Sequence, residues 1–185
     1  TFLHTLSLHD ALPIWVTVQN CYAWASKARA FGIFGEVNRP ITDVTFKNST
    51  VLCHEATWDP DLIPAIGIVA VNNEQGLGSI SGVTFENIEI CRNDAAPITC
   101  VTNLPITISD ITFDNVSFKS NNKPNGYPIR FEPFVGGTNI HSINFNNVSC
   151  NGTAITCTTD GSRVGNWETY LKDGTSCWII FEKKS

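Results

Sequence analysis

The stretch Val83-Thr84-Phe85-Glu86-Asn87 decides the fold, because the order apolar, polar, apolar, polar, Asn describes a half-buried strand that ends in a turn residue. The same pattern returns four more times along the chain. Successive terminal asparagines lie 28, 39, 28 and 32 residues apart, so the repeat unit is close to 28 residues, with an insertion in one unit. The other copies are residues 16–20, 44–48, 111–115 and 143–147.

A second strand recurs between these copies, again with apolar residues at alternate positions. The turns carry Gly, Asn, Asp and Pro, and no run of helical periodicity separates the strands, so a βαβ sheet is disfavoured. Each strand would instead pair with its counterpart in the next repeat, about 4.8 Å away. The sequence therefore predicts an all-β fold, a single-stranded right-handed parallel β-helix (solenoid) of about five coils. The second strands are expected at residues 31–33, 66–68, 98–100, 129–131 and 155–157.

Stacked repeats place equivalent side chains above one another, which predicts two columns. Four phenylalanines would form an internal aromatic ladder, with Val18 in their place in the first coil. The repeated asparagines tolerate the left-handed conformation, and their amides can hydrogen-bond along the stack. Asn48, Asn115, Asn147 and Asn151 also match the N-x-[ST] acceptor pattern, and we favour the ladder for the first three because they lie on the repeat. The expected ladder phenylalanines are Phe46, Phe85, Phe113 and Phe145.

The two ends of the chain do not follow the repeat. Residues 1–14 resemble translated adapter sequence, so we expect a non-native or artefactual leader there. Coils are expected over residues 15–163, and residues 164–185, with their apolar run at 177–181, are expected to cap the open end of the stack. The chain contains no methionine, and we interpret it as a fragment of a longer reading frame.

Composition excludes several classes of function. The net charge is −5, and no basic run is longer than Lys183-Lys184, so no nucleic-acid partner is expected. No apolar stretch approaches the roughly 18 residues that span a bilayer, so we expect no membrane partner. We also expect a monomer. The seven cysteines form no C-x-x-C pair, so we expect no metal and no cofactor, and interpret most of them as small buried hydrophobes.

A β-helix with Asn-ended strands resembles the pectin-lyase-like superfamily, above all its polygalacturonase-like glycoside hydrolases, over about residues 15–160. The resemblance implies cleavage of a polysaccharide by paired carboxylates, in the extracellular space or the periplasm. The family motifs N-x-D, D-D, G-H-G and R-x-K are absent. Placing residues 31–35 on the G-H-G coil puts Arg29 where the family has His. The chain either lacks its catalytic half or belongs to a sister family, such as the dextranase-like β-helix enzymes.

The inserted loop at residues 53–61 is the best candidate for a functional site, because long loops on a solenoid usually build the binding face. Trp58 would stack on a sugar ring, and Asp59 or Asp61 would act as acid or base. An ordinary solvated loop with its Trp packed on the stack is the alternative.

Four further residues complete the predicted site. Glu36, at the end of the second strand of the first coil, is a further candidate catalytic carboxylate. Arg130 and Glu132, which alternation points outward, and Arg29 are candidate substrate contacts. A surface ion pair would explain Arg130 and Glu132 equally well.

Two functions remain open from the sequence. The first is a glycoside hydrolase acting on a polysaccharide or oligosaccharide. The second is a non-catalytic β-helix, such as an adhesin, a tail-spike or a carbohydrate-binding segment, which predicts no carboxylate pair in a groove. A lyase of the same superfamily would require a calcium site of clustered Asp, and none is evident. His54 and His141 have no partner at catalytic spacing and are interpreted as surface or turn residues.

Overall fold

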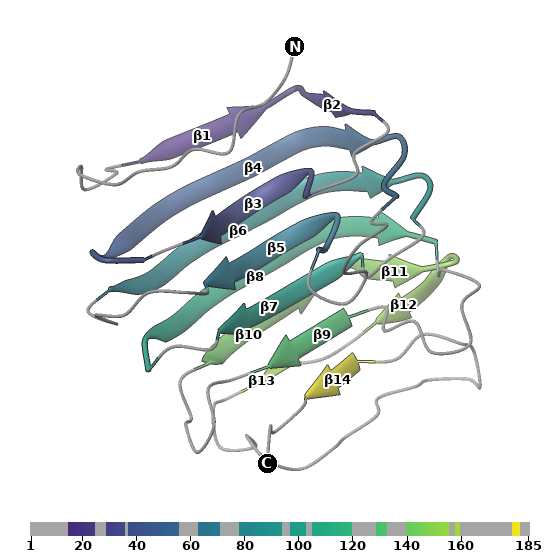
Figure 1. Cartoon of the computed structure of the whole chain (residues 1–185). Coiled ribbons are helices and arrows are strands. Elements are labelled where there is room, and N and C mark those ends of the chain that lie inside the picture. The colour runs from purple at the N-terminus through teal and green to yellow at the C-terminus, as the bar shows by residue number, and fades with distance from the viewer. Residues whose placement is uncertain are drawn as a thin grey trace.

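The structure is a computed structural model that describes residues 15–24, 29–35, 37–55, 63–70, 78–93, 97–102, 105–119, 129–132, 140–155, 158–159 and 179–181. These residues are all-β and lie in two sheets, and Figure 1 shows the strands stacked along the length of the molecule. No helix among them is long and apolar enough to cross a membrane. The expected leader at residues 1–14 lies outside this description.

The first sheet has nine strands, and its main path runs β1-β4-β6-β8-β10-β13. Neighbours on this path are parallel except at β13, and β2, β11 and β12 attach at the side of the path. The strands are β1 (Val16–Gln19), β2 (Tyr22–Ala23), β4 (Ile41–Val51), β6 (Ser79–Ile90), β8 (Thr107–Phe118), β10 (Ile140–Asn146), β11 (Val148–Cys150), β12 (Thr153–Ile155) and β13 (Thr158–Thr159).

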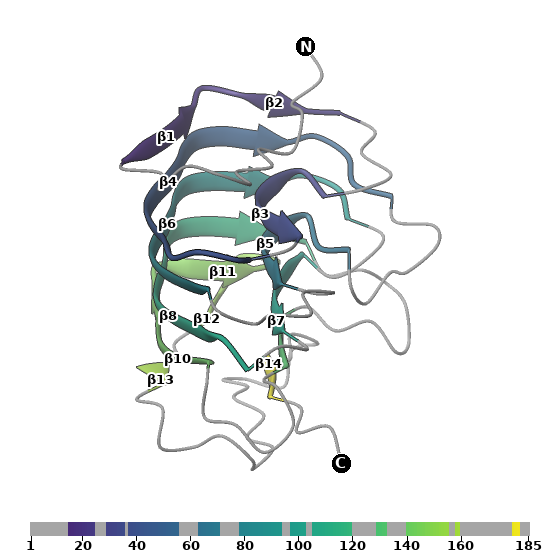
Figure 2. The ribbon, with the colours of Figure 1, turned by 60° about the vertical axis from the view of Figure 1, so that its left-hand side comes forward.

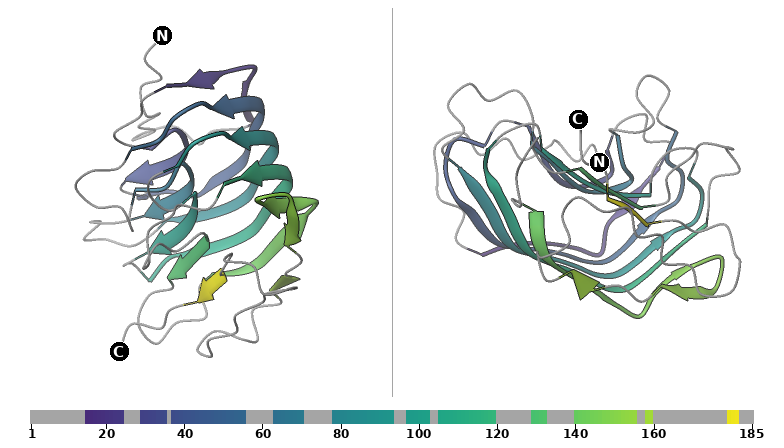
Figure 3. Two further views of the ribbon diagram at one scale, coloured as in Figure 1. Left: turned by 90° about the vertical axis from the view of Figure 1, so that its right-hand side faces the viewer. Right: turned by 90° about the horizontal axis from the view of Figure 1, so that it is seen from below.

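The second sheet has five parallel strands in the order β14-β9-β7-β5-β3. From β3 to β10 the chain alternates between the two sheets, so each strand returns beside its counterpart from the preceding repeat. Figures 2 and 3 show the two sheets facing each other, an arrangement compatible with a β-helix-like solenoid. The strands are β3 (Phe31–Gly35), β5 (Ile66–Ala70), β7 (Ile98–Thr102), β9 (Ile129–Glu132) and β14 (Ile179–Phe181).

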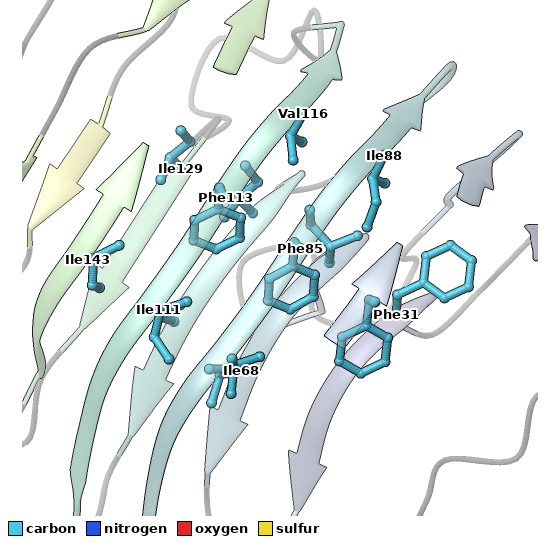
Figure 4. Close-up of a cluster of buried hydrophobic side chains, with 14 of the residues drawn as sticks. Phe31, Ile68, Phe85, Ile88, Ile111, Phe113, Val116, Ile129 and Ile143 are labelled. Carbon is cyan, nitrogen blue, oxygen red and sulfur yellow. The ribbon is translucent and has the colours of Figure 1, made fainter. Parts of the chain in front are cut away.

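The predicted phenylalanine ladder is confirmed. Phe46, Phe85, Phe113 and Phe145 are paired in register on adjacent parallel strands, and Val18 pairs with Phe46 in the first repeat. Successive ring centroids lie 5.1, 5.0 and 5.3 Å apart, and the rings are within 12° of parallel. This spacing matches the distance between hydrogen-bonded strands, so the backbone pairing itself imposes the stacking. Figure 4 shows the two central rings surrounded by isoleucine and valine side chains.

The asparagine ladder is confirmed as well. Asn48, Asn87, Asn115 and Asn147 have φ between 50° and 54°, the left-handed region that asparagine tolerates. The Nδ2 of each later asparagine donates to the Oδ1 of the one before it, at 3.0, 2.6 and 2.9 Å along the series. Asn20 has the same conformation, with φ 56°. One residue type therefore supplies both the bend and the hydrogen bonds that repeat along the stack.

A second column of left-handed residues lies five positions before the asparagines, and the sequence did not reveal it. Its φ angles lie between 55° and 65°. These residues bend β4, β6, β8 and β10 near their starts, so each long strand follows the curvature of the first sheet in straight segments. The column consists of Trp15, Asp43, Gly82, Asp110 and Ser142.

The expected second strand at residues 155–157 is wrong at Ile155, and residues 156–157 lie outside the described residues. Ile155 ends β12, which folds back antiparallel onto β11 in the first sheet. The place beside β9 is taken by β14, which pairs in parallel register and lies within the predicted capping segment. The cause is the turn at Asn151 and Gly152, whose φ angles of 50° and 78° reverse the chain after only two residues.

The described cysteines divide into two groups. Cys21, Cys91 and Cys100 are free thiols, and Cys100 is buried in the core, as expected for a small hydrophobe. Cys150 is disulfide-bonded. The disulfide is therefore attached at the last residue of β11, next to the turn of the β11–β12 hairpin.

Candidate functional site

The inserted loop is described only at its two roots. Trp58, Asp59 and Asp61 lie outside the described residues, and so does Glu36. The described chain enters the loop through Cys53, His54 and Glu55 and resumes at residue 63. The described residues around His54 hold the start of the loop.

His54 is fully buried, so its interpretation as a surface or turn residue is wrong. Its Nδ1 lies 2.9 Å from the Oδ1 of Asn93, and because that oxygen accepts, Nδ1 carries the proton. Its backbone N–H donates to the carbonyl of Arg92, and the two segments form a parallel bridge between His54 and Asn93. A buried side-chain hydrogen bond thus fixes His54 at the start of the loop.

Glu55 connects the same two segments at the surface. Its Oε1 lies 3.4 Å from a guanidinium nitrogen of Arg92. The same Oε1 accepts a hydrogen bond from the Sγ of Cys53 at 3.3 Å. The ion pair is partly exposed, so it adds little stability by itself. Together with the His54–Asn93 bond it holds the start of the loop; we call Cys53, His54, Glu55, Arg92 and Asn93 the loop anchor.

The spacing of the loop anchor was available in the sequence. His54 and Asn93 are 39 residues apart, the same interval as between Asn48 and Asn87. Residues separated by one repeat lie side by side in a stack, so this shared interval places the imidazole against the amide. Sequence reasoning missed the pair because it considered each histidine alone.

The outer face of the second sheet holds the remaining predicted residues. Phe31, Ile66, Ile98 and Ile129 point into the core, so the positions that follow them, Gly32, Gly67, Thr99 and Arg130, line up on the other face. A parallel column two residues further on contains Phe34, Val69, Val101 and Glu132. Arg130 and Glu132 share the backbone register of these two columns on β9, and the outward direction of their side chains stays a prediction.

The middle of this outer face is not open to solvent. Val69 is 1% exposed, Val101 is 3% exposed and Thr99 is fully buried, with a hydroxyl that has no hydrogen-bond partner. Backbones also approach closely here, because a Cβ on Gly67 would lie 1.9 Å from the carbonyl oxygen of Thr99. Gly67 has φ 142°, a conformation that L side chains rarely adopt, so glycine is required twice over. Any ligand site on this sheet lies toward β3 or β9.

Arg29 lies at the β3 end of this face. Its guanidinium carbon is 4.9 Å from the centroid of the Phe34 ring, within range of a cation–π contact. Phe34 is three strand spacings, about 14 Å, from Glu132 in the same column. Arg29 therefore lies beside β3, whereas β9 lies three strands away in the same sheet.

Two described thiols, Cys91 and Cys100, are poor nucleophiles. Burial, followed by the charge and hydrogen bond of Glu89, raises the pKa of Cys91, and the positive charge of Lys119 opposes this. Burial also raises the pKa of Cys100 well above its ordinary value, against a hydrogen bond with the Ile68 backbone. Because the thiolate is the reactive form, neither of these two thiols is suited to nucleophilic catalysis. Within the described part of the chain, no group of three His, Cys, Asp or Glu residues could hold a metal ion.

Of the described outer-face positions of the second sheet, only Glu132 carries a carboxylate. Acid–base chemistry there would need a second carboxylate from the loops. No family model, curated protein or solved structure matches this chain.

Proposed function

We propose that the chain is a right-handed parallel β-helix of about five coils, of the pectin-lyase-like kind, with residues 164–185 covering one end. The in-register pairing of β4, β6 and β8 and of β3, β5 and β7 supports this proposal. The general preference for right-handed connections between parallel strands supports the hand.

We further propose that it belongs to a carbohydrate-active protein, a polysaccharide-cleaving glycoside hydrolase similar to polygalacturonases. The loop anchor carries this proposal. A long loop bearing Trp58, Asp59 and Asp61 follows directly after His54, which is fully buried and hydrogen-bonded to Asn93. Catalytic carboxylates need a supported backbone to keep their geometry, and a buried hydrogen bond at the loop root provides that support.

In this proposal Asp59 and Asp61 act as acid and base, with Glu36 as a further carboxylate. Trp58 stacks on a sugar ring, and Arg29 contacts a sugar hydroxyl or carboxylate from its place on Phe34. Arg130 and Glu132 contact substrate at the far end of the same sheet. The protein acts as a monomer in the extracellular space or the periplasm, and the disulfide at Cys150 supports an oxidising location.

Measurement of reducing ends tests the hydrolase. Purified protein is incubated with polygalacturonate, dextran and related glycans. We expect release from one of them and a loss of at least about 100-fold in Asp59→Asn or Asp61→Asn, the usual contribution of a general acid or base. Glu86→Gln, which changes a half-buried carboxylate on the first sheet, is the matched control and should keep full activity. No reducing ends from any polymer would count heavily against hydrolysis.

A non-catalytic carbohydrate-binding segment is the second candidate. The observation that favours it is the outer face of the second sheet, where Glu132 is the one carboxylate among the described positions. This function predicts retarded migration in gels containing the right polysaccharide, without any chain cleavage. Arg29→Ala should abolish the retardation, whereas Asp59→Asn and Asp61→Asn should leave it unchanged.

A further inference from the structure

Four asparagines carry the N-x-[ST] acceptor pattern, and the structure separates them into two kinds. Asn48, Asn115, Asn147 and Asn151 are all exposed, so exposure alone does not distinguish them. The difference lies in the two residues that follow each one. An enzyme that glycosylates asparagine must bind the whole triad, so the backbone of the triad must be accessible.

In the three ladder triads the middle residue belongs to the core. Ser49 is 4% exposed, and Val116 and Val148 are fully buried. The third residues are paired with strands on both sides, as Ser117 is with Glu89 and Ser149. These triads are thus internal segments of the first sheet, and a transferase reaches them only if the sheet opens.

The ladder also uses the acceptor amides themselves. The Nδ2 of Asn115 donates to Asn87 at 2.6 Å, and the Nδ2 of Asn147 donates to Asn115 at 2.9 Å. The Oδ1 of Asn48 accepts from Asn87 at 3.0 Å. A glycan on any of these side chains would have to fit between neighbours only one strand spacing away, about 4.8 Å.

The fourth triad stands at the tip of a hairpin. Cys150 pairs with Thr153, so Asn151 and Gly152 form a two-residue turn with φ angles of 50° and 78°. Both residues are exposed, and a Cβ built on Gly152 meets no heavy atom within 4 Å. The hairpin of β11 and β12 lies at the periphery of the ribbon in both views of Figure 3. Asn151 and Gly152 are therefore accessible without opening a sheet, and Thr153 begins β12, which among the described strands pairs only with β11.

We propose that Asn151 is an N-glycosylation site and that the three ladder asparagines stay unmodified. The donor is a lipid-linked oligosaccharide pyrophosphate. A bond forms between Nδ2 and the anomeric carbon while the bond from that carbon to the pyrophosphate oxygen breaks; the lipid pyrophosphate leaves with the electron pair, and Nδ2 gives up one proton. The disulfide at neighbouring Cys150 fits the same oxidising compartment. This proposal is independent of the carbohydrate-directed function.

The test is secretion of the full chain, behind an export signal, from a yeast or insect host. Peptide N-glycosidase F in heavy-oxygen water then marks each formerly glycosylated asparagine as labelled aspartate for mass spectrometry. We expect the label at Asn151 alone. The enzyme-sensitive gel shift should be lost in Asn151→Gln and in Thr153→Ala, and Thr153→Ser should restore it.

The matched controls remove the ladder acceptor patterns while keeping the ladder amides. Thr50→Ala, Ser117→Ala and Ser149→Ala should leave the gel shift unchanged. Label at Asn48, Asn115 or Asn147, or secreted wild-type protein with unmodified Asn151, would overturn the proposal. Each replacement removes at most a hydroxyl and a methyl group or changes an exposed turn residue, so the fold should persist, and circular dichroism verifies this independently.

Discussion

Removing one ring from the middle of the phenylalanine ladder tests whether the column stabilises the protein beyond simple burial. Phe85 is fully buried and stacks on Phe46 at 5.1 Å and on Phe113 at 5.0 Å. Phe85→Ala should cost about 3–5 kcal/mol for the lost ring and the cavity. Each stacked pair adds about 0.5–1.5 kcal/mol beyond buried area. Domains are stable by about 5–15 kcal/mol, so the Ala variant is expected to be marginal and Phe85→Leu is the better probe.

Urea unfolding followed by circular dichroism gives the free energies, with an unchanged m-value as the check that the native state is intact. Phe85→Leu keeps most of the apolar volume and loses two stacked pairs. Phe145→Leu loses one pair among the described residues, at 5.3 Å to Phe113. We therefore expect Phe85→Leu to cost about 0.5–1.5 kcal/mol more than Phe145→Leu, the contribution of one pair.

A double-mutant cycle isolates the stacking term. The variants Phe85→Leu and Phe113→Leu should show a coupling of about 0.5–1.5 kcal/mol, because the two rings touch directly. Phe85→Leu combined with Ile143→Leu is the control, since β6 and β10 are separated by β8 and distant sites add within about 0.5 kcal/mol. Coupling no larger than in this control would refute the reasoning and reduce the ladder to ordinary hydrophobic packing.

Three further predictions concern the ladder, the loop anchor and a thiol. Asn115→Ala should be less stable in urea than Asn115→Gly by about 1–2 kcal/mol, the cost of φ 54° for a residue with a Cβ, and equal stability would contradict this. His54→Ala should lower the free energy of unfolding by at least about 1–3 kcal/mol, because the buried amide of Asn93 loses its hydrogen bond with His54. His141→Ala, at a half-buried position, should stay within about 0.5 kcal/mol of wild type. Similar thermal shifts in the two variants would count against the loop anchor. Because its pKa is raised, Cys91 should react with iodoacetamide only above the ordinary thiol pKa of about 8.5, and labelling at neutral pH would exclude this. The contribution of Cys91 to stability should be present below the ordinary thiol pKa and should be lost as the pH rises through the raised pKa.

The repeated strand was predictable because its pattern combines two independent physical requirements. Alternation places Phe85 and its equivalents inside, and the left-handed bend requires a residue such as Asn87. Both requirements restrict the residue type, so the same residue types recur at these positions in every repeat. The register of the first sheet and its two ladders followed from this recurring pattern alone.

The second column of bends has no such recurring residue type. Its residues Asp43, Gly82, Asp110 and Ser142 share a positive φ, but their side chains have no role in common. Several residue types satisfy that conformation, so the repeats differ at this position. A position constrained only in its backbone is invisible to a pattern of side chains, although its spacing of five before each asparagine is constant once the angles are known.

The strand at residues 155–157 was misplaced because local pattern and turn chemistry conflict there. Its apolar, polar, apolar order matches that of residues 98–100, which do form part of the second sheet. The preceding Asn151-Gly152 pair is a strong signal for a two-residue hairpin, and it sends Thr153–Ile155 back along β11. Turn geometry determines where a strand can go, whereas alternation only determines which of its sides is buried.

Stacking also explains why the candidate site lies at the loops. A strand position in a stack meets its own equivalent above and below, which favours residues that pair with themselves, such as Phe, Ile and Asn. Like charges in adjacent repeats repel at about 4.8 Å, so catalytic carboxylates are harder to accommodate on paired strands, although Glu86 and Asp114 form one such pair on β6 and β8. They are better placed in segments that leave the stack, provided that something fixes the point of departure. In this chain the buried His54–Asn93 bond fixes that point for the loop that carries Trp58, Asp59 and Asp61, so under the proposed hydrolase function disrupting the bond should lower glycan turnover.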